Sequence, residues 1–180
     1  GRPIIEQAYN VTADIGIIAK HVKTTGLIRL KELEPEAGVP IRPSLAERLR
    51  TIEDAIQKAG PRVGIEPKLD GLRIQVHVWP GAREKGVKLF SRNLENITPM
   101  FPEVVAASRR LKVRSAILDG EVIGYSPPTG KFVPFQETVQ RKRKYAIEEF
   151  TKKIPVSVFV FDILLRDGKS LLALPFRQRR

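Results

Sequence analysis

The chain has 180 residues, no cysteine and two histidines, and its 32 Lys and Arg against 20 Asp and Glu give a net charge of +12. These counts exclude disulfides and thiolate metal sites and leave little for a zinc site, so any bound metal would be a hard cation on carboxylates. No apolar run approaches the length of about 18 residues that a membrane span needs, and no signal-peptide pattern is present, which predicts a soluble, cytoplasmic protein. The positive charge favours a polyanionic partner, with nucleic acid or nucleotide ahead of a membrane.

The first part of the chain predicts one helix followed by a linker. Apolar residues recur at steps of three and four between residues 4 and 22, which indicates one face of a helix, and Gly26 would end that helix. Residues 34–40 have the composition of a linker. Because the apolar face of the helix needs a partner, we expect residues 1–39 to be the C-terminal end of a helical domain together with a linker.

A second helix is predicted directly after the linker. Ser44 with Glu47 three positions later matches a capping box, and the helix would end at residues 60–61, where Gly is followed by Pro. Its buried stripe would consist of Leu45, Leu49, Ile52 and Ile56. With a domain boundary near residue 40, this helix begins a second domain, residues 40–180.

From residue 63 onward the pattern changes to short strands. Apolar residues predict strands at 63–65, 72–79, 87–90, 116–123, 131–135 and 156–165. One helix is predicted at 102–111, and another begins near the chain end, at 175–180. This mixture of hairpins and isolated helices, without a regular alternation of strand and helix, predicts an α+β fold with mostly antiparallel sheets.

One lysine lies between two carboxylates directly before an Asp-Gly turn, in the pattern Glu66-x-Lys68-x-Asp70-Gly71-x-Arg73. Apolar residues on both sides predict a strand before and after it, so Lys68 is expected on a tight, partly enclosed connection. A lysine becomes a nucleophile when desolvation or a nearby cation makes its amine neutral. The alternative is a surface hairpin with scattered charges, which a bare Lys-x-Asp-Gly pattern does not exclude.

Four further motifs follow the lysine in a fixed order. They are Phe-Ser-Arg-Asn at 90–93, Leu-Asp-Gly-Glu at 118–121, Phe-Asp-Ile-Leu at 161–164, and Leu-Pro at 174–175 with Arg-Arg at 179–180. Together with the lysine pattern, this ordered set resembles the ATP-dependent DNA ligases of the covalent nucleotidyltransferase superfamily. Residues 4–16 resemble the end of the helical DNA-binding domain of archaeal and eukaryotic replicative ligases, residues 40–46 resemble the start of their adenylation domain, and residues 135–145 are most similar to the archaeal members.

The resemblance implies a fold and a reaction. The fold would be the N-terminal part of an ATP-grasp-like adenylation domain at 40–180, preceded at 1–39 by the end of the DNA-binding domain and a linker. Lys68 would attack the α-phosphate of ATP, hold AMP as a phosphoramidate, and pass it to the 5′-phosphate of a nick in double-stranded DNA, which the 3′-hydroxyl then seals. Mg²⁺ or Mn²⁺ would neutralise the phosphate charge. The parent protein would be a monomer, with a sliding clamp as a further partner through its N-terminal region.

The resemblance also implies five nucleotide-binding residues. Glu66 would accept a hydrogen bond from the adenine amino group, and Phe161 would stack on the adenine ring. Arg73 and Arg92 would hold ribose or phosphate oxygens, which suit a guanidinium fork. Glu121 would contact the ribose or a metal-bound water, because a carboxylate in so apolar a strand needs a partner. Each role has a structural alternative. Glu66 would be a surface charge at a strand edge, and Arg73 would be an outward residue of its strand. Arg92 would form a surface ion pair, and Phe161 would be a core side chain.

A run of four basic residues is a candidate DNA-binding segment: Arg141, Lys142, Arg143 and Lys144. Such a run could bind the phosphate backbone with salt-sensitive affinity, and a solvated face explains it equally well. Asp70 and Asp119 are compatible with an orienting role or with turn and strand structure alone. His21 and His77 have no partner pattern and are expected to be ordinary surface or strand residues.

Two later motifs of the family and its OB domain are not found before the sequence ends, so we expect a fragment of a longer protein. One alternative is an RNA ligase or a capping-type nucleotidyltransferase, which nucleotide preference would distinguish. Another is a catalytically incomplete fragment that binds nucleic acid and forms no covalent adduct. Few thermolabile residues, together with the similarity to archaeal ligases, favour a heat-adapted archaeal source.

Overall fold

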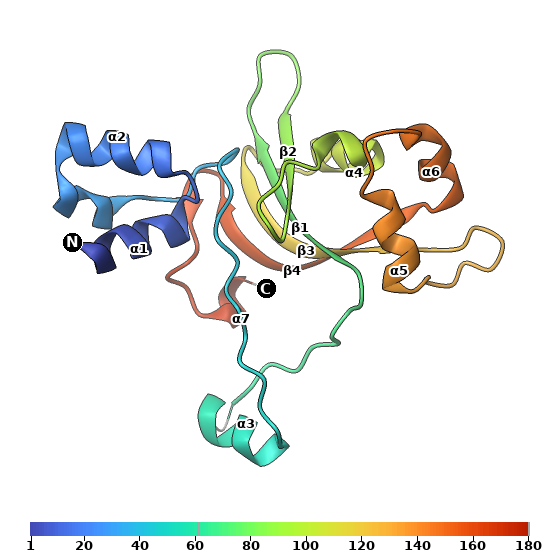
Figure 1. The fold of residues 1–180 in the computed structure, drawn as a ribbon, viewed down its shortest axis with the longest axis horizontal. Coiled ribbons are helices and arrows are strands. Elements are labelled where there is room, and N and C mark those ends of the chain that lie inside the picture. The colour runs from blue at the N-terminus through green and yellow to red at the C-terminus, as the bar shows by residue number, and fades with distance from the viewer. Residues whose placement is uncertain (61, 180) are drawn as a thin grey trace.

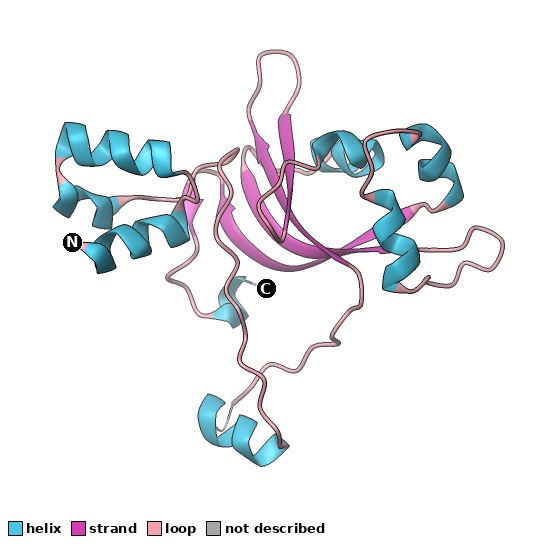
Figure 2. Ribbon diagram, viewed as in Figure 1, coloured by secondary structure: helices cyan, strands magenta, loops and turns pink. Residues whose placement is uncertain are grey.

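A curved five-stranded antiparallel sheet forms the centre of the computed structural model, which describes residues 1–60 and 62–179 (Figure 1). The spatial order of the strands is β2-β1-β3-β4-β5. Their bounds are Leu72–Trp79 for β1, Gly86–Ser91 for β2, Ala116–Gly124 for β3, Val156–Arg166 for β4 and Lys169–Ser170 for β5. The α+β fold with antiparallel strands is confirmed, and it places helices at both sides of a single sheet (Figure 2).

The two faces of the sheet differ in polarity because side chains alternate along each strand. On β1, Ile74, Val76 and Val78 are buried in the main core, where they pack with residues of α4 (Pro102–Arg109) and of the chain just before it. The residues that alternate with them along the strand are Arg73, Gln75 and His77, and their side chains point to the opposite face. One face therefore forms the main core, and the other presents polar side chains beside a smaller apolar cluster around Ile117 and Ile41.

The helix predicted at 4–22 is instead two helices, α1 (Arg2–Val11) and α2 (Ile15–Thr25), which pack with a short 3₁₀ helix at Leu27–Glu32. The break occurs because the side chain of Asp14 accepts a hydrogen bond from the backbone N–H of Ile17 at 3.0 Å and so caps a new helix. We call residues 1–33 the helical unit. Gly26 ends α2, as predicted.

The predicted capping box at Ser44 is wrong. Helix α3 spans Ile52–Ala59, and Thr51 caps it by accepting a hydrogen bond from the backbone N–H of Asp54 at 3.1 Å. Acidic residues in the first turn after Thr51 favour a helix N-terminus at that point. Gly60 ends the helix as expected, whereas Pro61 lies outside the described residues. In Figure 1, α3 stands apart from the sheet, and its predicted buried stripe is exposed at Ile52 and Ile56.

Two predicted strands are not formed. Residues 62–71 are a loop without strand pairing, in which Ile65 is 91% exposed, so the apolar residues before the lysine have no neighbouring strand to pack against. The segment predicted as a strand at 131–135 makes a single bridge from Phe132 to Tyr125 and then enters helix α5. The remaining helices are α5 (Phe135–Thr138), α6 (Ile147–Lys153) and α7 (Phe176–Arg179), with 3₁₀ turns at Thr98–Met100 and Val139–Arg141. No described helix is long and apolar enough to span a bilayer.

Candidate functional site

Strand pairing brings the charged residues of three motifs onto the polar face of the sheet. Arg73 on β1 lies directly opposite Glu121 on β3, and Gln75 lies opposite Asp119. Asp119 in turn lies opposite Asp162 on β4, next to an irregularity in the β3–β4 register. Residues far apart in sequence therefore form one cluster around the start of β1.

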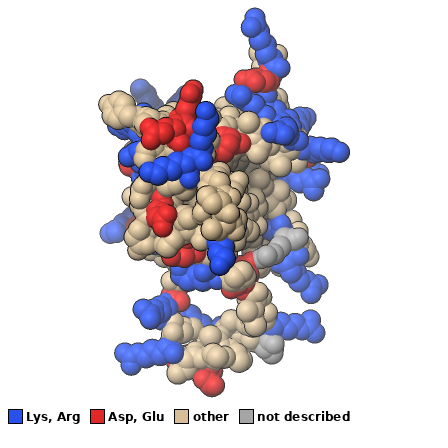
Figure 3. All heavy atoms as spheres, turned by 90° about the vertical axis from the view of Figure 1, so that its right-hand side faces the viewer, with Lys and Arg blue, Asp and Glu red and all other residues tan. Residues whose placement is uncertain are grey.

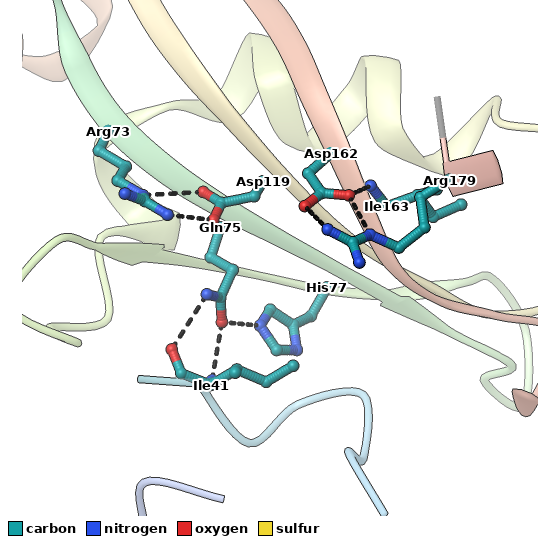
Figure 4. A network of polar contacts seen from close by, with 8 residues as sticks. All are labelled: Ile41, Arg73, Gln75, His77, Asp119, Asp162, Ile163 and Arg179. Carbon is teal, nitrogen blue, oxygen red and sulfur yellow. Dashed lines mark hydrogen bonds and ion pairs between the residues drawn. The ribbon is translucent and has the colours of Figure 1, made fainter. Parts of the chain in front are cut away.

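Arg73 is the centre of this cluster and not an outward strand residue. Its guanidinium binds the carboxylate of Asp119 with two hydrogen bonds, of which Nε to Oδ1 is 3.0 Å (Figure 4). The same guanidinium lies 5.5 Å from the centroid of the Phe161 ring, within cation–π range. Burial raises the pKa of Asp119, and the nearby negative charge of Asp162 raises it further. The hydrogen bonds and the positive charge of Arg73 oppose both effects. One arginine on β1 thus contacts the Leu-Asp-Gly-Glu motif on β3 and the Phe-Asp-Ile-Leu motif on β4.

Glu121 faces the loop that carries the lysine. Its Oε1 accepts a hydrogen bond from the backbone N–H of Gly71 at 3.1 Å, which ties the Asp-Gly turn to β3. A Cβ at Gly71 would lie 2.2 Å from the carbonyl oxygen of Val122, so only glycine fits this close approach. Burial raises the pKa of Glu121, whereas the Gly71 N–H and the positive charges of Lys68 and Arg73 lower it. The carboxylate is therefore within electrostatic reach of the lysine.

Lys68 lies on the loop at 62–71, not on a tight connection between two strands. The side chains of Lys68, Glu66 and Asp70 are all exposed, so the enclosure expected from the sequence is not provided by the described residues. The missing strand explains this difference, because a loop without a paired neighbour has nothing to cover it. The loop is nevertheless anchored three residues after the lysine, where Gly71 contacts Glu121 directly before β1.

Arg92 follows β2 in an exposed turn, one position beyond Ser91, which pairs with Ile74. It lines an open hollow of about 790 Å³ together with Arg42 and the C-terminal end of α1. Within the described part of the chain, no hydrogen bond or ion pair joins Arg92 to the other predicted site residues. Strand order places it at the same end of the sheet as Arg73.

The four basic residues at 141–144 have very different surroundings. Arg141 is 1% exposed, pairs with Glu103 and donates a hydrogen bond to the carbonyl of Met100 at 3.3 Å, so its role is structural and the predicted DNA contact is wrong for this residue. Lys142 pairs with Glu95, and the Arg143 guanidinium lies 3.6 Å from the centroid of the Phe150 ring. Lys144 is exposed. Figure 3 views the molecule from the side that carries α4, α5 and α6 and shows Lys and Arg side chains around its rim, with Asp and Glu side chains among them.

The structure adds residues that sequence reasoning missed. Arg179 binds Asp162 through two hydrogen bonds of 2.8 Å, which hold α7 against β4 (Figure 4), while Arg180 of the same motif lies outside the described residues. Gln75 is buried, and so is His77, which was expected to be an ordinary surface or strand residue. The alternation of polar and apolar residues along β1 was the signal that could have shown Gln75 and His77 to lie on one face of the sheet.

The described residues do not form a metal site by themselves. They contain no group of three or more His, Cys, Asp or Glu side chains that could hold a metal ion. The carboxylate of Asp119 is already bound to Arg73, and Glu121 alone offers a single carboxylate. Magnesium in nucleotide enzymes is commonly held by one or two carboxylates together with the substrate phosphates. The single carboxylate of Glu121 would therefore bind such an ion only together with a nucleotide.

Comparison with known proteins agrees with the motif pattern. A family model described as "ATP dependent DNA ligase domain" matches residues 43–180. The chain is 45% identical over 180 residues to a probable DNA ligase of Dictyoglomus turgidum, covering 99% of the chain and 30% of that relative. It is also 45% identical over 180 residues to a DNA ligase of Aeropyrum pernix, covering 99% and 29%. The chain thus spans about 30% of the length of the curated relatives that it matches.

Solved structures give matches of the same kind. The ligase domain of M. tuberculosis LigD matches with 28% identity and a TM-score of 0.48, covering 64% of this chain and 33% of that one. A mycobacterial DNA ligase D complexed with ATP and MES matches with 30% identity and the same TM-score and coverage. Because the family model covers residues 43–180, well over half of the sequence, the chain belongs to the ATP-dependent DNA ligase domain family.

Proposed function

We propose that this chain is the central part of an ATP-dependent DNA ligase in which Lys68 carries AMP. The observation that supports this most directly is the family match over residues 43–180, which includes the loop of Lys68 and the cluster around Arg73. Residues 1–39 would be the end of a DNA-binding domain with its linker, and residues 40–180 the first part of the adenylation domain. The relatives named DNA ligase, at about 45% identity, favour DNA over RNA as the substrate.

The first step would form a bond between the Nζ of Lys68 and the α-phosphorus of ATP, while the bond from that phosphorus to pyrophosphate breaks. The amine must lose a proton before it attacks, and the exposed position of Lys68 lets water accept it. AMP would then pass to the 5′-phosphate at a nick, and the 3′-hydroxyl would displace AMP to close the phosphodiester bond. Two easier transfers thereby replace one difficult bond formation.

The site residues would divide the nucleotide between them. Glu66 would accept from the adenine amino group, Glu121 would bind the ribose, and Arg73 and Arg92 would hold phosphate or ribose oxygens. Phe161 would stack on adenine. The adenine would either lie on the ring face that the Arg73 guanidinium does not cover or displace that guanidinium from the ring. Mg²⁺ or Mn²⁺, when bound with the nucleotide, would supply charge neutralisation at the phosphates.

Other features of the parent protein are proposed on the resemblance alone. The parent would act on nicked duplex DNA as a monomer, near the nucleoid, and a sliding clamp would contact it through a region before residue 1. Lys144, together with Lys142 and Arg143, would contact phosphates of the duplex without reading its sequence.

Intact mass after incubation with ATP and magnesium tests the covalent step. We expect a gain of one AMP in the natural chain and in Lys112→Ala, which removes another exposed lysine, and no gain in Lys68→Ala. The adduct should be lost in acid, because a phosphoramidate bond hydrolyses at low pH. An adduct that persists in Lys68→Ala contradicts the proposal, and DNA binding without any adduct, also in the longer parent protein, favours a binding fragment. In a parallel incubation with GTP and magnesium, a GMP adduct together with no AMP adduct from ATP would indicate a capping-type enzyme.

A further inference from the structure

Residues 38–42, which we call the crossing segment, run over the polar face of the sheet and are held by a buried glutamine. The side-chain oxygen of Gln75 accepts a hydrogen bond from the backbone N–H of Ile41 at 2.8 Å, and its Nε2 donates to the carbonyl of Ile41 at 3.1 Å (Figure 4). Gln75 is 5% exposed, and Ile41 is equally buried. One side chain thus satisfies both backbone groups of a residue as a neighbouring strand would.

A buried histidine completes the contact. The Nδ1 of His77 accepts a hydrogen bond from the backbone N–H of Gly38 at 3.1 Å, so the proton of the neutral ring is on Nε2, which lies 3.0 Å from the side-chain oxygen of Gln75. Burial and the charge of Lys88 lower the pKa of His77 to about 3, which keeps the ring neutral. Each donor in this network therefore faces an acceptor, and the amide orientation of Gln75 is fixed.

The other edge of the crossing segment is bound to the helical unit. The backbone N–H of Ala13 donates to the carbonyl of Pro40 at 2.9 Å, and the N–H of Arg42 donates to the carbonyl of Asn10 at 3.3 Å. Between these bonds, the side chain of Ile41 packs with three buried residues of β3 and β4, namely Ile117, Leu164 and Leu165. The segment is therefore bonded on one edge to the sheet and on the other to the junction of α1 and α2.

The same glutamine adjoins the nucleotide end of the sheet. Gln75 lies directly opposite Asp119, the residue that binds Arg73 through two hydrogen bonds. A path of direct neighbours thus leads from the helical unit through the crossing segment to Arg73. Buried hydrogen bonds of this kind are rigid because breaking one leaves a polar group without a partner.

From this arrangement we infer that Gln75 and His77 are positioning residues that fix the helical unit relative to the nucleotide site, so that both parts contact one DNA duplex together. The inference rests on the proposed function, since it assumes that both parts bind DNA. Two binding surfaces held in a fixed relation gain affinity because the second contact becomes intramolecular and little orientational freedom remains to be lost. Neither residue touches the reacting atoms.

The first test measures the crossing segment without nucleotide or DNA. A glutamate-specific protease can cut after Glu36, which is exposed and lies two residues before the start of the segment. We expect faster cutting at Glu36 in Gln75→Leu and in His77→Leu, with the cutting rates at the other glutamates unchanged. The matched control is Ser115→Ala, which removes another side-chain hydrogen bond, from the N–H of Gly168 to Ser115 Oγ at 3.0 Å, in which the crossing segment takes no part. Equal cutting at Glu36 in all variants overturns the inference.

The second test separates positioning from chemistry. In Gln75→Leu we expect the dissociation constant for nicked duplex DNA to rise about tenfold, while formation of the AMP adduct stays within about twofold of the natural chain. His77→Asn should restore DNA affinity relative to His77→Leu, because the asparagine oxygen can accept from Gly38 where Nδ1 does. Unchanged DNA affinity in Gln75→Leu overturns the inference. If the natural chain forms no AMP adduct, that result contradicts the proposed function instead. The cutting rate at Glu36 does not depend on adduct formation.

Discussion

The two ends of strand β1 show opposite ways of holding functional side chains. At one end, Gln75 and His77 are buried and all their hydrogen-bonding atoms have partners. At the other end, Lys68 is exposed on a loop and is held only through Gly71 and the charge of Glu121. The difference indicates that buried hydrogen bonds hold the crossing segment in place, while the lysine that we propose to carry AMP remains exposed.

The largest expected effect concerns the buried end and pH. The pKa of His77 is lowered from 6.5 to about 3 in the folded protein, so the unfolded chain takes up a proton first as the pH falls. The free energy of unfolding should therefore be unaffected by this group above pH 6.5, and should fall by about 1.4 kcal/mol for each pH unit between 6.5 and 3. Urea unfolding at several pH values measures this slope.

The control for this prediction is His77→Asn, which keeps an acceptor for Gly38 but does not titrate. The difference in slope between the two proteins isolates His77 from the carboxylates, since Glu95 and Asp167, whose pKa values are lowered, also lose stabilising interactions in acid. If both proteins show the same slope between pH 6.5 and 5, the histidine is not buried and neutral as described.

The second prediction compares a buried with an exposed basic residue. Arg141→Met should lower the free energy of unfolding by about 3 kcal/mol, because it leaves the Glu103 carboxylate without its partner. Lys144→Met, on the exposed part of the same segment, should change stability by less than about 0.5 kcal/mol. Denaturant titration of the two variants measures both values. Similar losses would mean that the segment is not divided into a buried anchor and an exposed part.

The third prediction sharpens the description of the open end. Gly71→Ala places a Cβ against the Val122 carbonyl and should move the loop away from Glu121, lowering the rate of AMP adduct formation about tenfold, or about 1.4 kcal/mol. Gly64→Ala is the matched control on the same loop, since its Cβ would meet only the Phe176 ring at 3.8 Å. Time courses of intact mass compare the two. Equal rates would show that the Gly71 contact does not position the lysine.

The smallest expected effect concerns DNA affinity. Lys144→Ala should weaken binding of any duplex sequence alike and reduce the slope of log affinity against log salt by about one, because one phosphate contact is lost. Lys112→Ala serves as the comparison, since it removes the same charge outside the segment. An unchanged salt slope in Lys144→Ala would assign this residue to a solvated surface.

Local sequence patterns predicted much of the sheet and little of the loops. The alternation in β1 and the apolar runs of β3 and β4 were strong enough to predict these strands to within one residue. The caps at Asp14 and Thr51 were missed, because several polar residues near each helix start could have served, and only the folded backbone selects one. The strand expected before Lys68 failed because a strand needs a paired neighbour, which no local pattern specifies.

By itself, the sequence determined the family, the α+β class and the order of the motifs, because these depend on residue identity and short-range periodicity. Only the tertiary structure decided which residues meet: strand pairing brought Arg73 to Asp119 and Phe161, and packing outside the sheet buried Arg141 beside Glu103. The hydrogen bonds of the crossing segment were also decided by the tertiary structure, since those between Gln75 and Ile41 join residues 34 positions apart. Contacts at such separations follow from packing and burial of the whole chain, and no local pattern encodes them.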